Sequence, residues 1–372
     1  MKRSLTLVPA LAVATVVMPK YAGYISAIIM IAVIIFLHEL GHFLAAKWMG
    51  MPVSEFALGL PFGPFIRFFT WKETAVGVRP FAPFGGYVKL AGYNPEEPDA
   101  EDPYGFLQQP FRKRMLFYSG GVLANMATAF LIFTVMGAQG GKSSPLLISE
   151  VLAGSPAAAA GVKSGDLITA IGELRFPGSK LAAFQPYIAN HTGQPLELTL
   201  DRSGQVVTTK IVPVSDQGSG KLGIRYSPTQ RTFDPRQLTL KELAKAPYYG
   251  LRSTADLTWE VLRGLGQLVS RRASFKQVGG PVTILKVASQ QAQEGWMGFF
   301  GFMAFISINL AVLNALPIPF LDGGHMAILV FEKLRQKELS IQIKEKILTA
   351  GFFFLATLMI MVLAMDFLRM RH

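Results

Sequence analysis

The sequence predicts a polytopic α-helical membrane protein that carries one inserted α+β domain. Of its 372 residues, 51% are hydrophobic and only 16% are charged, a balance that excludes an ordinary soluble protein. Four segments are long and apolar enough to cross a bilayer as helices. Between the second and the third lies a stretch with the alternation and turn signals of a small α+β domain.

The predicted spans follow the hydropathy of the chain. They run from Tyr21 to Ala46, Met115 to Ala138, Trp296 to Leu316 and Ile347 to Leu368. A shorter apolar stretch, Ser4 to Met18, covers only about 22 Å of a hydrocarbon core of about 30 Å. Residues 1–20 therefore form an N-terminal extension that is either a retained fifth span or a removed signal, and the sequence leaves both open.

Positive charge beside the spans indicates their orientation. The net charge is +12, and Lys and Arg cluster after the first span, before the second, and between the third and fourth. By the positive-inside rule these loops face the cytoplasm, so the long segment between the second and third spans lies outside. Lipid headgroups explain this charge better than nucleic acid, which we exclude as a partner.

The rest of the chain divides into regions of different composition. The first membrane part covers 21–139, the inserted domain 144–230, an amphipathic helical linker 231–295 and the second membrane part 296–372. Within the first part, Trp71 to Leu90 is strand-like but broken by Pro and Gly, which predicts a membrane-associated β-hairpin. In the linker, Leu238 to Arg272 is a basic amphipathic helix that would lie on the membrane or dock on the inserted domain.

The inserted domain is predicted from short elements separated by turn residues. They are a strand at Leu146 to Val151, a helix at Ser155 to Gly161, a strand at Leu167 to Ile171, a helix at Leu181 to Ala189, and a hairpin of Leu196 to Leu200 with Val206 to Val212.

A metal-binding motif ends the first predicted span, where His38, Glu39 and His42 form H-E-x-x-H. On a helix the two histidines share a face and can bind one metal, while Glu39 can act as a general base. The alternatives are an incidental match and a structural polar cluster, but ionisable residues inside a span are rarely kept without a function. The site lies about 25 Å from the outer end of the span, toward the cytoplasm. We predict hydrolysis of peptide bonds inside a membrane.

A catalytic zinc site takes three protein ligands and keeps one position open. Since the chain has no cysteine, the third ligand must be His, Asp or Glu. Asp322 directly follows the third span and is the best candidate, with His325 as a competitor or as a partner of a ligand.

Four motifs together resemble the bacterial site-2 protease family of intramembrane zinc metalloproteases, of the RseP type with a PDZ domain. They are H-E-L-G-H at 38–42, G-G-Y-V-K at 85–89, G-G-V-L-A-N at 120–125 and N-A-L-P-I-P-F-L-D-G at 314–323. The resemblance covers Tyr21 to Leu368. It implies that His38, His42 and Asp322 bind one Zn²⁺ and that Glu39 is the catalytic acid/base. The substrate-handling positions that it implies are Asn309, Asn314, Pro317 and Pro319.

The resemblance also implies a bacterial inner-membrane protein. Its substrates would be single-span membrane proteins already shortened by a first cleavage, the family's classes being anti-sigma factors and remnant signal peptides. The region with A-G-V-K-S-G-D at 160–166 resembles a PDZ module that would bind a peptide tail or filter substrates by size, and the alternative is an inert spacer. The chain departs from the family pattern in three ways: Val122 replaces a usual proline, only one PDZ-like domain fits, and residues 1–20 have no counterpart.

A transmembrane substrate must unwind before cleavage, because its carbonyl groups are bonded within its own helix. Asn309 and Asn314 could bind the freed backbone groups, or they could simply join helices. The broken strand with Gly85, Gly86 and Tyr87 could pair with the extended substrate by β-augmentation, or it could be a plain structural hairpin.

Two other classes of function fit parts of the sequence. A catalytically silent membrane adaptor would hold partners through the PDZ-like domain and would not need Glu39. A metal transporter would need polar groups along its spans, whereas this sequence has one H-E-x-x-H site and no chain of acidic residues across the other spans. We therefore expect a zinc metalloendopeptidase.

Overall fold

The computed structural model describes residues 22–81, 85–93, 99, 101–138, 146–175, 184–216, 219–228, 240–270, 279–293 and 295–370. The chain divides into two compact units. Residues 1–134 and 247–372 form one, which we call the membrane unit, and residues 135–246 contain the inserted domain.

Four described helices of the membrane unit are long and apolar enough to cross a membrane. They are α2 (Ala22–Trp48), α3 (Phe111–Ala138), α8 (Trp296–Ala315) and α10 (Ile341–Met370). This confirms the four predicted spans, although α10 begins at Ile341 rather than Ile347. The short apolar stretch predicted at Ser4 to Met18 lies outside the described residues.

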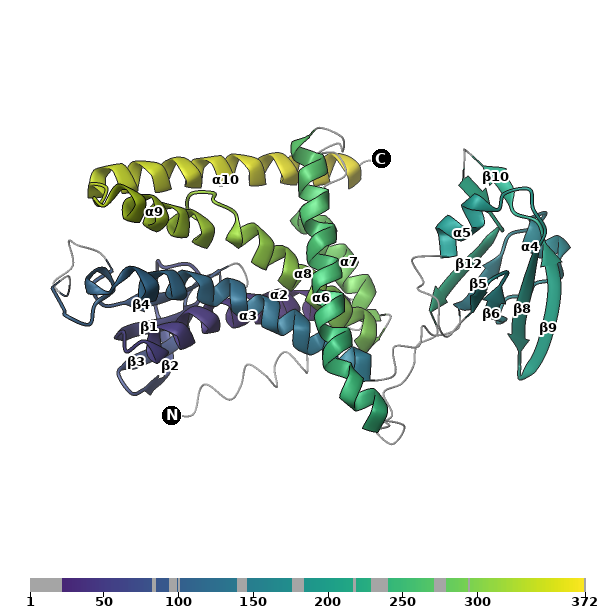
Figure 1. Ribbon diagram of the computed structural model, residues 1–372, viewed down its shortest axis with the longest axis horizontal. Coiled ribbons are helices and arrows are strands. Elements are labelled where there is room, and N and C mark those ends of the chain that lie inside the picture. Colours follow the sequence, from purple (N-terminus) through teal and green to yellow (C-terminus); the bar gives the residue numbers. More distant parts are fainter. Residues whose placement is uncertain are drawn as a thin grey trace. The chain divides into compact units, whose positions relative to one another are not determined.

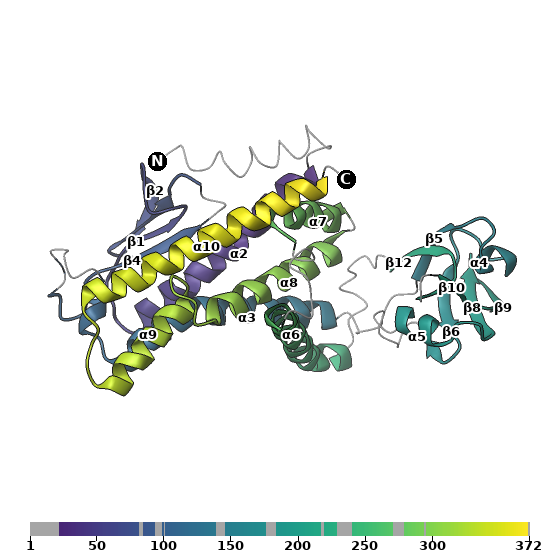
Figure 2. The same ribbon diagram turned by 90° about the horizontal axis from the view of Figure 1, so that it is seen from above.

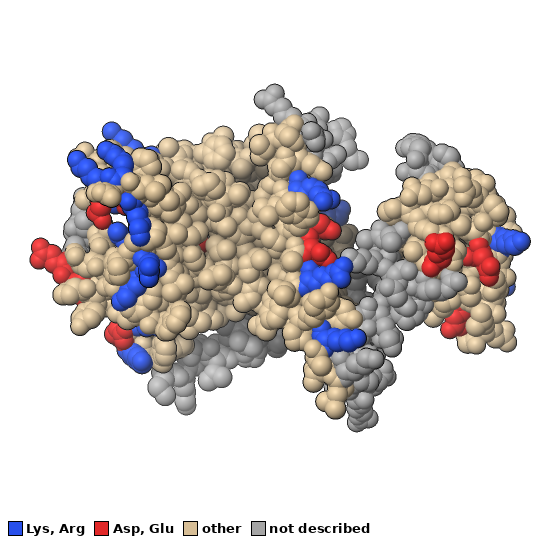
Figure 3. Space-filling model, in the orientation of Figure 1, with Lys and Arg blue, Asp and Glu red and all other residues tan. Residues whose placement is uncertain are grey.

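Charged side chains are distributed unevenly over the membrane unit. Figure 3 shows Lys and Arg gathered at the end where α9 (Asp322–Arg335) lies and again along α6 (Leu240–Val269), with almost no charge on the visible face between them. An uncharged belt bounded by cationic residues is what a bilayer-spanning protein presents, because charge is costly in the hydrocarbon core.

A four-stranded mixed sheet follows α2 in the chain. Its strands are β1 (Val53–Leu58), β2 (Ile66–Trp71), β3 (Thr74–Val78) and β4 (Gly86–Leu90), in the order β2-β3-β1-β4. β1 pairs parallel with β3 and antiparallel with β4, so β4 is an edge strand. The sheet has more strands than the hairpin that the sequence predicts, and the two strands within 71–90, β3 and β4, flank β1 instead of pairing with each other. All six residues of β2 are exposed, so this strand has no inside-outside alternation to reveal it.

An aromatic core joins this sheet to the end of α2. Phe43 of α2 stacks on Phe56 of β1, with ring centroids 5.1 Å apart, and both are buried. Phe117 of α3 and Phe106, in the short 3₁₀ helix η3 (Phe106–Gln108), belong to the same core. Buried aromatic pairs of this kind contribute beyond their buried area, so the core holds the last turns of α2 firmly.

Two further helices support the spans. α6 runs across the long helices in Figure 1 and is seen end-on in Figure 2. Its residues Val261 and Leu265 pack beside Ala129 and Ile308, so the predicted amphipathic helix docks partly on α3 and α8. The sequence does not predict α7 (Pro281–Gln293), whose Ala288 packs into a core shared with α2.

The beginning of α7 is fixed by a carboxylate from α10. Asp366 Oδ1 accepts from the Gly280 N–H at 3.1 Å and from the Thr283 hydroxyl at 2.8 Å. Asp366 Oδ2 accepts from the main-chain N–H groups of Val282 and Thr283 at 3.1 and 3.2 Å. These bonds satisfy orphan donors at the helix start, and they explain a buried acid in an apolar helix.

The inserted domain has the α+β composition that the sequence predicts. Its elements are β5 (Leu146–Val151), α4 (Pro156–Ala159), β6 (Leu167–Ile171), β7 (Leu174–Arg175), α5 (Phe184–Asn190), β8 (Leu196–Arg202), β9 (Gln205–Ile211), β10 (Val214–Asp216), β11 (Ser219–Lys221) and β12 (Ile224–Pro228). The main sheet follows the order β12-β5-β6-β8-β9, and β7 pairs with β6. The predicted hairpin is β8-β9, whose turn places Ser203 and Gly204 at φ of 54° and 89°. β12, which pairs with β5, is not predicted by the sequence.

Candidate metal centre

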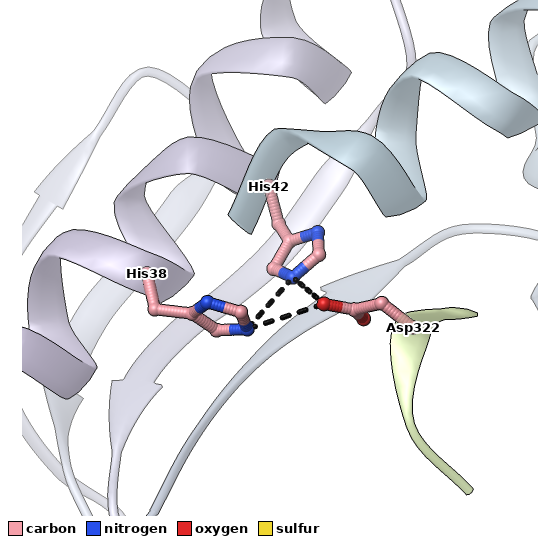
Figure 4. A group of neighbouring side chains, drawn as sticks. All are labelled: His38, His42 and Asp322. Atoms are coloured by element: carbon pink, nitrogen blue, oxygen red, sulfur yellow. Dashed lines mark hydrogen bonds and ion pairs between the residues drawn. The ribbon is translucent and has the colours of Figure 1, made fainter. Parts of the chain in front are cut away.

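Three side chains from distant parts of the sequence converge in the membrane unit (Figure 4). His38 and His42 point from α2 toward Asp322, the first residue of α9. His38 Nε2 and His42 Nε2 lie 3.3 Å apart, and each lies 3.3 Å from Asp322 Oδ2. Among the described residues, no other group of three His, Asp or Glu side chains has ligand atoms close enough to share a metal ion.

This arrangement fits a zinc ion. With metal–ligand bonds of about 2.0 to 2.1 Å, neighbouring ligands of a tetrahedral ion lie about 3.3 to 3.4 Å apart. The three atoms are at that spacing, and a tetrahedron with three protein ligands keeps its fourth corner open. Asp322 Oδ2 is also buried and accepts no hydrogen bond, although two imidazole nitrogens are near it. A buried carboxylate oxygen without a hydrogen bond is rare, and a cation would satisfy it.

The two histidines are buried and held by α3. They are 7% and 5% exposed, so water does not compensate for the polar ring atoms. The Nδ1–H of His42 donates to the main-chain oxygen of Phe117 at 2.8 Å, since a carbonyl can only accept. Nε2 of His42 is then left with the lone pair that a metal needs. On His38, Nδ1 lies 3.1 Å from the side-chain amide of Asn125.

The backbone of α3 passes directly beside the three ligand atoms. A Cβ added to Gly121 would lie 2.4 Å from His42 Nε2 and 2.7 Å from His38 Nε2. Both distances are far below normal contact, so any side chain at this position would displace the imidazoles. Gly121 therefore leaves a space that a metal ion and its ligands can use.

A tight loop delivers Asp322 to the histidines. The residues between α8 and α9 include Pro317 and Pro319, and Phe320 has a left-handed φ of 78°. A Cβ at Gly324 would lie 2.2 Å from the main-chain oxygen of Ile318, so the loop is folded closely onto the start of α9. Burial alone would raise the pKa of Asp322, but the two imidazoles hold it below its usual range, so the group is an anion.

A cavity of about 840 Å³ opens in front of the three ligands. Besides them it is lined by Glu39, Asn314, His325 and the residues Gly85 to Leu90. Gly86 touches Glu39, because a Cβ there would lie 2.5 Å from Glu39 Cγ. The volume lies within the range of ligand-binding pockets.

The predicted substrate-handling residues do not all reach this cavity. Asn314, Gly85, Gly86 and Tyr87 line it. The side chain of Asn309 instead donates to the main-chain oxygen of Phe305 on its own helix at 2.8 Å. Pro317 and Pro319 are not lining residues and belong to the loop that precedes Asp322. Substrate handling stays a prediction for the residues that line the cavity as well as for Asn309 and the two prolines.

His325 lines the same cavity but does not belong to the group of three. Its ring stacks on Tyr118, with centroids 4.7 Å apart and planes 7° from parallel. The Tyr118 hydroxyl donates to that of Tyr93 at 3.2 Å. Burial lowers the pKa of His325, which therefore stays neutral near pH 7.

Several residues that contact the histidines or line the cavity were not identified from the sequence. Gly121 and Asn125 belong to the G-G-V-L-A-N motif, but nothing in the sequence says that they face the histidines. In the sequence, Tyr93 and Tyr118 cannot be distinguished from ordinary aromatic core residues. Their only signal is a polar group near or within an apolar span, which is equally typical of helix packing.

Comparisons with known proteins identify the family of the chain. Residues 26–358 match the model of peptidase family M50. A protein of Nostoc sp. whose name includes the words zinc metalloprotease is 34% identical, over 92% of this chain and 95% of its own. A similarly named protein of Clostridium acetobutylicum is 31% identical, over 93% and 98% of the two chains. The chloroplastic membrane metalloprotease ARASP of Arabidopsis thaliana is 32% identical, over 94% of this chain and 81% of its own.

Solved structures match a smaller part of the chain. The PDZ domain of an SdrC-like protein from Listeria monocytogenes is 22% identical, with a TM-score of 0.20. The match covers 22% of this chain and 87% of that domain. A PDZ domain of the same type from Listeria innocua is 21% identical, with a TM-score of 0.21.

Proposed function

The chain belongs to peptidase family M50, and we propose that it is a zinc-dependent endopeptidase that cuts single-span membrane proteins within or next to the bilayer. One observation carries this proposal. His38, His42, Asp322 and Glu39 line one cavity of a unit whose described helices include four apolar enough to span a membrane. Ionisable side chains at membrane depth are costly, so an acid beside three metal ligands in such a unit indicates a catalytic function.

Zinc, when bound, supplies Lewis acidity, which polarises a peptide carbonyl and makes water acidic enough to lose a proton near neutral pH. The residues of the chain do the rest. Glu39 takes the proton of the attacking water on its carboxylate and then gives it to the nitrogen of the departing amine. Because Gly86 packs against Glu39, the carboxylate is held beside the rim strand β4, where a substrate would enter.

Strand β4 is suited to hold the substrate. It is an edge strand of the four-stranded sheet, and residues of β4 line the cavity. An unwound substrate segment can add to this edge, so that its backbone groups find partners where water is scarce. Asn314 lines the same cavity and offers an amide to any backbone group that the edge leaves unpaired.

The inserted domain would act on the part of the substrate outside the bilayer. It contains a groove lined by Phe184, Ile188, Leu222, Tyr226 and the cation Lys221. An apolar groove with a cation suits a peptide tail that ends in a carboxylate. By the positive-inside rule this domain lies on the outer side of the membrane, and we propose that this is a bacterial plasma membrane.

The test is cleavage of a panel of single-span substrates by the full chain in detergent. Wild type is compared with Glu39→Gln, and Glu345→Gln on the exposed surface of α10 is the matched control. We expect cleavage by wild type and by the control. Removing a general base costs about 10²- to 10⁴-fold in rate, so Glu39→Gln should fall by that factor while still binding zinc.

Equal cleavage by Glu39→Gln and wild type would overturn the assigned chemistry. Unchanged function in cells with the Glu39→Gln variant would instead support a silent membrane adaptor. Zinc content is measured on the same samples, because a chain that binds no zinc would refute the metal site itself.

A further inference from the structure

Both metal-binding histidines are contacted from behind by the same helix. Nδ1 of His42 meets the main-chain oxygen of Phe117, and Nδ1 of His38 meets the side chain of Asn125 two helical turns further along α3. The first contact fixes the tautomer of His42, because a carbonyl oxygen can only accept a hydrogen bond and Nδ1 must therefore carry the proton. The second depends on which end of the Asn125 amide faces the ring.

The orientation of that amide decides whether His38 can bind a metal. With Nδ2 of Asn125 facing Nδ1, the ring nitrogen accepts, and a neutral imidazole must then carry its proton on Nε2. A protonated Nε2 has no lone pair for an ion. Half a turn of the amide exchanges its two ends without moving any other heavy atom, and Oδ1 then accepts the Nδ1–H.

The place of His38 Nε2 among the three ligand atoms points to this second orientation. Asn125 is fully buried, and its Oδ1 has no hydrogen-bond partner. Only the orientation in which this oxygen accepts the imidazole N–H leaves His38 Nε2 with the lone pair that a metal ligand needs. In this orientation His38 has the same tautomer as His42, with Nε2 of both rings directed at Asp322.

We propose that Asn125 is a positioning residue for the metal centre. Its side-chain oxygen keeps Nδ1 of His38 protonated and turns Nε2 toward the metal position. The inference rests on the proposed zinc site and adds a residue that never touches the ion. Partners of this kind fix the tautomer and orientation of ligating histidines, and losing one lowers metal affinity by about 10- to 100-fold.

A second contact of Asn125 supplies a matched control. The Ser307 hydroxyl from α8 donates to the main-chain oxygen of Asn125 at 2.9 Å, and both residues are fully buried. Ser307→Ala removes a buried hydrogen bond at the same residue but leaves the amide side chain in place. It therefore reports the general effect of loosening this point between α3 and α8.

The experiment measures zinc affinity of the full chain in detergent by competition with a chelator. We expect Asn125→Leu, which has a similar shape and no acceptor, to bind about 10- to 100-fold more weakly than wild type. Asn125→Asp supplies an acceptor oxygen and should bind at least as tightly as wild type. The zinc affinity of Ser307→Ala should stay within about 3-fold of wild type, a much smaller change than the one expected for Asn125→Leu.

The visible spectrum of the Co²⁺ form adds a readout that mere destabilisation does not change. A rotated His38 should shift the cobalt bands of Asn125→Leu, while Ser307→Ala keeps the wild-type spectrum. Equal affinity of Asn125→Leu and wild type would overturn the inference and leave the zinc site intact. If Asn125→Leu does not fold, an Asn125→Asp affinity at least 10-fold below wild type also overturns it. Absence of zinc binding in wild type refutes the proposed site itself.

Discussion

Two aspartates, one in each unit, show how differently a carboxylate can be used. In the inserted domain Asp166 accepts from Arg202 through both oxygens at 2.7 Å and from the Lys163 N–H at 2.8 Å. In the membrane unit Asp322 Oδ2 accepts no hydrogen bond, although two imidazole nitrogens lie 3.3 Å away. The first carboxylate is fully satisfied by the chain, and the second is not.

The difference separates a structural group from a functional one. A satisfied buried anion stabilises its surroundings and has no capacity left for a ligand. An unsatisfied one is tolerated only if something else completes it, and three atoms at tetrahedral spacing point to a cation. On this argument, changing Asp322 should alter chemistry and changing Asp166 should alter stability.

The largest expected effect follows from Asp322→Asn. The substitution replaces an anionic ligand by a neutral one, so we expect zinc content to fall from about one per chain and cleavage to fall to background. Treatment of wild type with a chelator should do the same, and added zinc should restore cleavage. The measurements are metal content and a gel assay, with Asp166→Asn as the carboxylate control. Full zinc content in Asp322→Asn, together with its loss in His325→Ala, would move the ligand role to His325.

A smaller effect should follow when pH is lowered on the inserted domain. The Arg202 guanidinium and the Lys163 N–H hold the pKa of Asp166 below its usual range. The stability that this provides is therefore present above the ordinary pKa of about 3.9 and is lost as pH falls through the lower folded value. Hydrogen exchange of the peptides at 146–228 in the full chain should show this loss. Asp166→Asn should be less stable at pH 7 by roughly 1 kcal/mol, after allowance for solvent screening, and should respond less to acid.

An effect of similar size concerns a third carboxylate, Glu55 at the rim of the cavity. It binds Arg79 at 2.9 Å and also the Tyr87 hydroxyl, so it resembles Asp166 in being satisfied. Burial and Glu55 raise the pKa of Tyr87 to about 12, which keeps this hydroxyl a donor at neutral pH. Tyr87→Phe should lower stability by about 0.5 to 1.5 kcal/mol without changing zinc content. Thermal unfolding in detergent tests this against Tyr24→Phe, and a loss of zinc would contradict it.

Sequence reasoning could find the parts of the centre that rest on local periodicity. Spacing by four residues places His38 and His42 on one helix face, and an uninterrupted apolar run identifies α2. Asp322 was predicted as the third metal ligand from its position after a span and from a family resemblance. Its distance to the histidines depends on the loop with Pro317 and Phe320, whose path no local pattern specifies.

Other features were beyond sequence reasoning for physical reasons. The α7 helix is too short and too polar to be a span, and its start depends on Asp366, which lies on a different helix. Asn125 stands in an apolar span, where an amide is as typical of helix packing as of a metal centre. Only the three-dimensional arrangement shows that it faces His38.

The separation of the ligands along the chain also has a consequence for biosynthesis. His38 and His42 leave the ribosome early, whereas Asp322 is added only after both the sheet and the inserted domain have been made. At elongation rates of about 5 to 20 residues per second, this interval lasts roughly 15 to 55 seconds. During that time the nascent chain has only two of its three ligands. A membrane metalloprotease of this family is therefore made without a complete metal centre, and it gains one only when most of its own spans have been synthesised.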